Sequence, residues 1–236
     1  MSELAYDRLE EMIVSCALRP GLLLSIPELQ ERLRMGRTPT HLAVSRLAAD
    51  TLIVIRPRKG LQIAPIELPR ERTLLRLRRD LERFAVRLAV ERATPAHQAE
   101  LARIGELLGD EAKSMTVEAF NHLDRRINHI LIAASGVAFL ESALRPLHTI
   151  FRRVGWIYHR VLRPAEGPSR TIDCHRAILD AVIARRAKEA VKAADALIAF
   201  NEAMLQALDG DIDPALLDCN AGSGRPAGRR SISKRG

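Results

Sequence analysis

Two short β-prone runs joined by a basic turn constrain the fold of this chain more than any other feature. Residues 52–55 read LIVI, residues 61–64 read LQIA, and the five residues between them read RPRKG. Apolar, β-branched runs separated by a short loop that contains glycine are typical of a β-hairpin. The sequence therefore predicts a hairpin whose tip carries positive charge.

Three short helical segments come before this hairpin. Apolar residues recur at helical spacing over residues 4–17, and a Pro-Gly pair at 20–21 ends that segment. Ser25 and Glu28 form the pattern of a capping box at the start of a second helix. A Thr-Pro pair at 38–39 opens a third helix by the same logic. The order of helix, helix, short turn, helix and hairpin is that of a winged helix-turn-helix.

The third helix and the hairpin tip carry the groups that DNA recognition needs. Hydrogen-bonding side chains at the front of a helix can read base edges in the major groove, and cations can contact phosphates. Gly60 at the hairpin exit would let the backbone approach DNA closely. The candidate DNA-binding residues are Arg37, Thr38, Thr40, His41, Arg46, Arg58, Lys59 and Gly60. The alternative is a solvated basic face on a small helical domain.

The rest of the chain divides into a helical region and a tail. Residues 69–209 show helical periodicity almost throughout, which predicts an all-α antiparallel bundle. The expected fold is therefore mainly α, with a winged helix-turn-helix in residues 1–66 followed by the bundle. Residues 210–236 are expected to form a basic, disordered tail, because the chain ends in the Gly-, Ser- and Arg-rich run AGSGRPAGRRSISKRG.

Composition narrows the possible partners. The 236 residues carry a formal net charge of +8, which favours polyanions such as DNA. No apolar run approaches the roughly 18 residues that a membrane-spanning helix needs, so no membrane partner is expected. The three cysteines are scattered and never spaced as CxxC. This argues against a disulfide framework or a zinc ribbon and suits free thiols in a reducing cytoplasm.

The first region resembles the GntR family of bacterial regulators. Its residues 36–47 read GRTPTHLAVSRL where family members typically read SRTPVREALRRL. The other matching segments are residues 5–6, 18–21, 52–53 and 56–60. His41 and Leu42 stand where the family usually has an arginine and a glutamate, so the operator sequence cannot be carried over from the family.

The second region resembles the FadR-type C-terminal ligand-binding domain of the same family. Residues 124–136 read DRRINHILIAASG, similar to the family's DxxFHxxLxxASG, with Ile127 and Asn128 in place of its phenylalanine and histidine. Residues 175–181 match its HxxIxxA, and residues 78–82 match the start of its first long helix. The resemblance implies a helical domain that binds a small-molecule effector.

The resemblance also implies a divalent metal site inside this domain. The family's ligands are an aspartate, a histidine four residues later and two histidines from later helices. In this chain the four positions fall on Asp124, Asn128, His175 and either Leu197 or Asn201. His129 is one residue out of phase, about 100° further round the helix. Asp124 and His175 alone leave a zinc or nickel site incomplete. The alternative is a polar cavity without metal.

An acidic effector in such a cavity would need cationic partners. The candidate effector-binding residues are Arg78, Asp124, Asn128, Arg152 and His175. Small organic acids or sugar acids are the effectors that the resemblance implies.

Three functions are consistent with these features. The first is a ligand-responsive regulator that binds a palindromic operator in double-stranded DNA as a homodimer. The second is a DNA-binding regulator whose helical domain only dimerises. The third is a metal-dependent helical enzyme with a basic accessory domain. The sequence carries no nucleophile motif, P-loop or GxGxxG, so we expect no enzymatic activity.

Overall fold

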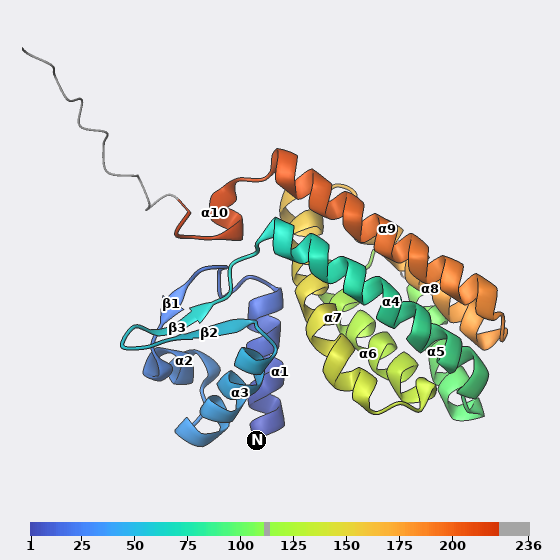
Figure 1. Ribbon diagram of the computed structural model, residues 1–236, viewed down its shortest axis with the longest axis horizontal. Helices are drawn as coiled ribbons and strands as arrows, with labels where there is room; N and C mark the ends of the chain where they lie inside the picture. Colours follow the sequence, from blue (N-terminus) through green and yellow to red (C-terminus); the bar gives the residue numbers. More distant parts are fainter. Residues whose placement is uncertain (111–113, 222–236) are drawn as a thin grey trace, which may run out of the picture.

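The computed structural model describes residues 1–110 and 114–221. Figure 1 shows a small N-terminal domain of short helices and strands beside a larger bundle of long helices. The expected mainly α fold, a winged helix-turn-helix followed by a helical bundle, is confirmed. Within the described residues, no helix is long and apolar enough to cross a membrane.

The N-terminal domain has three helices and a three-stranded antiparallel sheet. In chain order the elements are α1 (Ser2–Val14), β1 (Leu23–Leu24), α2 (Ile26–Leu33), α3 (Arg37–Ala49), β2 (Ile53–Arg56) and β3 (Gly60–Ile63). β3 lies between β1 and β2, and Arg56 pairs with Gly60 across the predicted hairpin turn. The predicted capping box is present at α2, because Ser25 and Glu28 bond to each other in both directions.

The second domain begins with a long helix that crosses the bundle. Its elements are α4 (Leu68–Arg92), α5 (Pro95–Asp110), α6 (Val117–Ser135), α7 (Phe139–Ile157), α8 (Ser169–Ile183) and α9 (Ala187–Asp211). One turn of π-helix, Tyr158–Leu162, continues α7. α4 packs against α6 and α9, and α8 packs against α5 and α9, so the polar groups on their inner faces meet at the centre of the bundle.

The two domains share part of their core. One hydrophobic cluster joins buried side chains of the N-terminal domain, such as Ile13, to Phe151 and Val154 of α7. Arg153, buried on α7, donates a hydrogen bond of 2.7 Å to the carbonyl oxygen of Ala64. The setting of the winged domain on the bundle is therefore a packed interface rather than a loose tether.

An ion pair also ties the end of α3 to the bundle. Asp50 follows α3, accepts a hydrogen bond from the Tyr6 hydroxyl and lies 3.2 Å from Arg145 of α7. A movement of α7 would therefore displace Asp50 and with it the end of α3, the helix that is expected to enter DNA.

The expectation of a disordered tail from residue 210 is wrong for residues 210–221. A short helix, α10 (Pro214–Leu217), packs on the winged domain, where the buried Leu217 accepts a hydrogen bond from Ile66 through its backbone. Cys219 likewise donates through its backbone to Pro20. The buried side chain of Leu217 anchors this segment to the core. The amino-acid composition of the tail does not indicate such an anchor. The remaining basic residues, 222–236, lie outside the described residues.

Candidate functional site

The N-terminal turn of α3 presents the side chains expected to read DNA. Arg37, Thr38 and His41 are all exposed there. The helix begins after Gly36, which has an extended backbone. No side chain of the described residues caps this helix start, so its first N–H groups are left for a phosphate to accept from.

Two residues of the expected DNA-binding set have partners within the domain. The side chain of Thr40 is fully buried, and its hydroxyl donates to the carbonyl oxygen of Gly36. Arg46 turns toward α1, where it forms an ion pair of 2.6 Å with Glu3 and lies 4.0 Å above the ring of Tyr6. The burial of Thr40 contradicts its expected contact with DNA, whereas the side chain of Arg46 is 40% exposed and its expected phosphate contact stays a prediction.

The wing tip presents two exposed cations. Arg58 and Lys59 lie in the turn between β2 and β3, and Arg58 has a positive φ of 62°. Gly60 follows with φ 91°, and a Cβ there would lie 2.7 Å from the carbonyl oxygen of Leu24. The glycine is therefore required by the close approach of β1, whereas the sequence suggested a close approach of DNA.

A small cavity lies at the centre of the bundle. Helices α4, α6, α7, α8 and α9 contribute to its wall, and each supplies at least one of the polar side chains that converge on it, namely Arg78, Asp124, His148, Arg152, His175 and Asn201. Its free volume is about 30 Å³, which is room for one or two water molecules. Four of the five expected effector-binding residues line this cavity. The fifth, Asn128, donates to Asp124 over 3.2 Å from just outside it.

Asp124 and His175 form a buried ion pair in this cavity. Nε2 of His175 lies 2.7 Å from Oδ1 of Asp124, and Nδ1 lies 2.8 Å from the carbonyl oxygen of Thr171. Burial opposes both charges, but the imidazolium and Arg152 hold the pKa of Asp124 at about 2. Burial would likewise lower the pKa of His175, and Asp124 reverses this and raises it. The pair is therefore charged near neutral pH.

A second buried network lies beside the first. Glu82 is shared between Arg78, at 3.0 Å, and Nε2 of His148, at 2.8 Å. Burial alone would raise the pKa of Glu82, but His148 and Arg78 outweigh it and hold the pKa at about 2. Asp124 in the cavity wall and Glu82 beside the cavity are thus both already balanced by the protein's own cations.

The residues present do not fit the metal that the resemblance implied. Within residues 1–110 and 114–221, no three side chains of His, Cys, Asp or Glu are placed to hold one ion. Asn128 and Asn201 both use their amide nitrogens as donors, to Asp124 and to the carbonyl oxygen of Leu197. A cation already occupies the neighbourhood, because Arg152 Nε lies 3.8 Å from Asp124. His129 is exposed, lies 3.8 Å from Glu141 of α7 and does not line the central cavity, as its one-residue shift predicts.

Arg152 connects the cavity to the winged domain. While its Nε faces Asp124, its Nη2 lies 2.9 Å from Oε1 of Glu10, a buried residue of α1. Thr149 donates to the same Glu10 oxygen, and Arg125 lies 3.5 Å from the other. One guanidinium therefore contacts a carboxylate in each domain.

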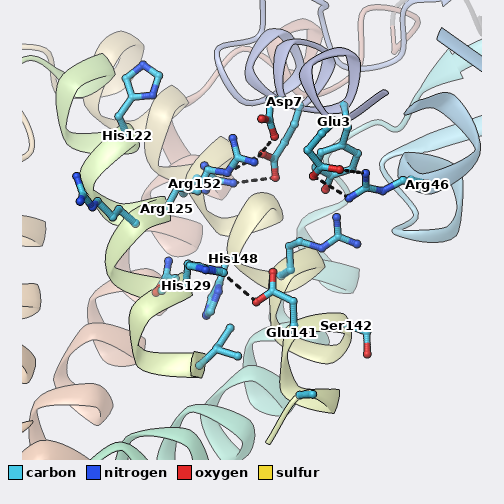
Figure 2. Close-up of a pocket in the computed structure, with 17 residues that line it drawn as sticks. Glu3, Asp7, Arg46, His122, Arg125, His129, Glu141, Ser142, His148 and Arg152 are labelled. Atoms are coloured by element: carbon cyan, nitrogen blue, oxygen red, sulfur yellow. Dashed lines mark hydrogen bonds and ion pairs between the residues drawn. The ribbon is translucent and has the colours of Figure 1, made fainter. Parts of the chain in front are cut away.

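A large cleft separates the two domains at this point. Its free volume is about 910 Å³, within the usual size range of ligand pockets. Figure 2 shows Asp7 of α1 facing Arg125 of α6 across it, while Glu3 of α1 points to Arg46 of α3. His148 and Arg152 line both the cleft and the central cavity.

Comparisons with known proteins decide the family. Residues 1–63 match the model of bacterial regulatory proteins of the gntR family, and residues 73–200, more than half of the chain, match the FCD domain. The chain belongs to the GntR family and carries an FCD domain. It is a ligand-responsive, DNA-binding transcriptional regulator.

Relatives of this GntR-family regulator carry matching names. It is 30% identical over 148 residues to the Nta operon transcriptional regulator of Aminobacter aminovorans, covering 62% of this chain and 69% of that protein. It is 28% identical over 131 residues to the HTH-type transcriptional regulator McbR of Escherichia coli, covering 56% and 59%. The solved structure of E. coli McbR/YncC has the same fold, with a TM-score of 0.75, 23% identity and coverage of 87% of this chain and 96% of that one.

The sequence interpretation missed the residues that join the two halves of this GntR-family regulator. Glu10 is one of them, although a signal was present: Tyr6, Glu10 and Val14 are spaced four apart, and Tyr6 belongs to an apolar stripe. An acid on the buried face of a helix calls for a buried cation, which is Arg152.

Proposed function

We propose that this regulator binds a palindromic operator as a homodimer, through the start of α3 and the wing. Arg37, Thr38 and His41 would read bases or contact phosphates in the major groove, and Arg58 and Lys59 would contact the flanking backbone. The exposure of these five side chains on neighbouring elements supports this assignment. The buried Thr40 is not part of the proposed contact set, and Arg46 would reach a flanking phosphate only by releasing Glu3.

The effector of this regulator is a small carboxylate that binds at the buried polar centre of the FCD domain. The observation that carries this proposal is the convergence of Arg78, Arg152 and His175 on one cavity inside an otherwise apolar bundle. Each of these cations already pairs with a carboxylate of the protein, so a small carboxylate would bind by replacing one of those acids on a guanidinium. Asp124 and Asn128 would orient those cations. No metal is needed, because the protein's own cations supply the positive charge.

The small size of the cavity keeps a second candidate function open, namely a DNA-binding regulator whose helical domain only dimerises. About 30 Å³ is too little for a carboxylate of several heavy atoms, so the bundle would have to open to admit one. A domain that only dimerises would have no reason to open. The enzyme alternative is weaker, because its metal site lacks a third ligand in the described residues.

One experiment separates these functions. Light scattering of the purified protein with a palindromic fragment of its own promoter gives the number of chains per site. A panel of small mono- and dicarboxylates is then added, and both the melting temperature and the DNA affinity are followed. Two chains per palindrome and a carboxylate that changes both quantities support the proposal. Two chains per palindrome with no response to any carboxylate favour the dimerisation function.

A further inference from the structure

Only a few side chains of α7 separate the central cavity from the interdomain cleft. Both hollows are lined by the same two side chains of α7, His148 and Arg152. The cleft is bordered by exposed side chains such as Ser142, whereas His148 is buried and the side chain of Arg152 is only 10% exposed. A molecule that reaches Asp124 from the cleft therefore has to pass Arg152.

Of the two hollows, only the cleft is large enough for a ligand. The cleft holds about 910 Å³ and the cavity about 30 Å³. Ligand pockets usually hold about 300 to 1,000 Å³, so in this conformation a metabolite fits the cleft and not the cavity.

The arginines of α6 and α7 that line the cleft form ion pairs with acidic side chains of the winged domain. Arg125 pairs with Asp7, and Arg152 pairs with Glu10 at 2.9 Å. Arg152 Nε has no hydrogen-bond partner in the described part of the chain, although its side chain is nine-tenths buried. Nη1 of Arg145, on the same wall, is equally without one. These guanidiniums have donor capacity that the protein itself leaves unused.

We propose that the interdomain cleft is an effector subsite for a small polycarboxylate, one of whose carboxylates takes the place of Glu10 on Arg152. This inference rests on the proposed carboxylate-sensing function and extends it from the cavity to the cleft. A carboxylate can accept two parallel hydrogen bonds from a guanidinium, so it can engage the unused Nε together with Nη2. A second carboxylate on the same molecule reaches Arg145 or Arg125.

Occupation of this subsite changes what the winged domain contacts. Glu10 is buried, and once Arg152 turns to the ligand it keeps only Thr149 and the more distant Arg125. A buried carboxylate that has lost its main cation is destabilised, which weakens the docking of α1 on α7. The ligand thereby has different affinities for the docked and the released winged domain, which is the requirement for a response at the DNA.

Citrate titrated into the purified protein tests the subsite, with chloride at equal ionic strength as the control for screening. The readouts are the rise in melting temperature and the dissociation constant from calorimetry. Arg152→Gln should weaken citrate binding about tenfold or more, and Glu10→Gln should tighten it about threefold. Arg83→Gln is the matched control, because Arg83 pairs with Asp195 away from the cleft and should change nothing.

Ser142→Trp distinguishes the cleft from the cavity. Ser142 is exposed on α7, lines only the cleft, and can take a large side chain without disturbing the core. It should abolish citrate binding and leave the melting temperature of the free protein unchanged.

Three outcomes overturn the subsite, and each says something different of the proposed function. Citrate binding that Ser142→Trp leaves intact places the ligand in the cavity alone, so carboxylate sensing stands and the cleft subsite falls. If Glu10→Gln leaves citrate binding unchanged, the ligand does not replace Glu10 on Arg152. No binding of citrate at millimolar concentration, while a monocarboxylate of the panel does bind, also rejects the subsite and keeps the proposed function.

Discussion

Nε2 of His175, on α8, lies 2.7 Å from Oδ1 of Asp124, on α6. The two side chains are almost completely buried, and they join helices that are about 50 residues apart in the chain. Such a pair holds α6 and α8 in register only while both partners are charged. Its contribution to stability therefore depends on pH in a direction that can be worked out.

The stabilisation by His175 should decline in alkaline solution. The folded-state pKa of His175 is raised above its ordinary value of 6.5, and that of Asp124 is about 2, so Asp124 stays ionised throughout. A raised histidine pKa gives a contribution that is complete below pH 6.5 and is lost as the pH rises through the folded-state pKa. His175→Gln should lower the free energy of unfolding by about 3 kcal/mol at acidic to neutral pH, and by less near pH 9.

Urea denaturation of both proteins across this pH range checks the prediction. His129→Gln is the matched control, because the side chain of His129 is 71% exposed. A difference between wild type and His175→Gln that stays constant with pH would show that the pair is not ionic.

Asn128→His should create metal affinity that the natural chain lacks. Asn128 lies 3.2 Å from Asp124, one helical turn further along α6, so a histidine there would add a third ligand to Asp124 and His175. Three protein ligands of this type suit nickel or zinc. We expect nickel to raise the melting temperature of Asn128→His and EDTA to reverse the rise. Asn128→Ala is the control, and an equal response of the wild-type protein would contradict the proposed metal-free site.

Gly60→Ala should destabilise the winged domain. Gly60 has φ 91°, and the new methyl group would lie 2.7 Å from the carbonyl oxygen of Leu24. Strain of this kind costs about 1–3 kcal/mol. Gly210→Ala is the comparison, because Gly210 is in α9 with nothing within 4 Å of the added atom. Thermal unfolding of the two variants should differ clearly, and a wild-type melting temperature for Gly60→Ala would mean that β1 does not lie against the wing.

Leu217→Ala should destabilise the protein by about 2 kcal/mol. Leu217 is 9% exposed and fills the junction between α10 and the winged domain, whereas the neighbouring Leu216 is 37% exposed. Leu216→Ala should therefore cost less than about 0.5 kcal/mol. Chemical denaturation of the pair measures the difference. Equal effects would indicate that residues 212–221 do not dock as the structure shows.

Local rules predicted most of the winged domain correctly. The hairpin, the capping box at Ser25 and the breaks between helices depend on neighbouring residues, which the sequence states directly. The family ligand positions likewise led to Asp124 and His175, which the structure brings together.

The errors concern which way a side chain faces. Thr40 is three residues before Ala43 and seven before Leu47, so it belongs to the buried stripe of α3 although its hydroxyl suggested DNA. The sequence also carried no indication that Arg46 pairs with Glu3 or Arg152 with Glu10, because these contacts join elements far apart in the chain. Periodicity identifies a helix and its buried face but not the partner that a charged side chain meets.

The affinity of promoter DNA for Arg37→Ala tests the central claim most directly. The fragment is taken from around the regulator's own gene, and fluorescence anisotropy compares it with a scrambled fragment at two salt concentrations. We predict that Arg37→Ala weakens the promoter fragment about ten- to hundredfold and removes its preference over scrambled DNA. Arg46→Gln, whose arginine is paired with Glu3, should retain that preference. Weak, salt-sensitive binding that prefers neither fragment and ignores Arg37→Ala would contradict the account.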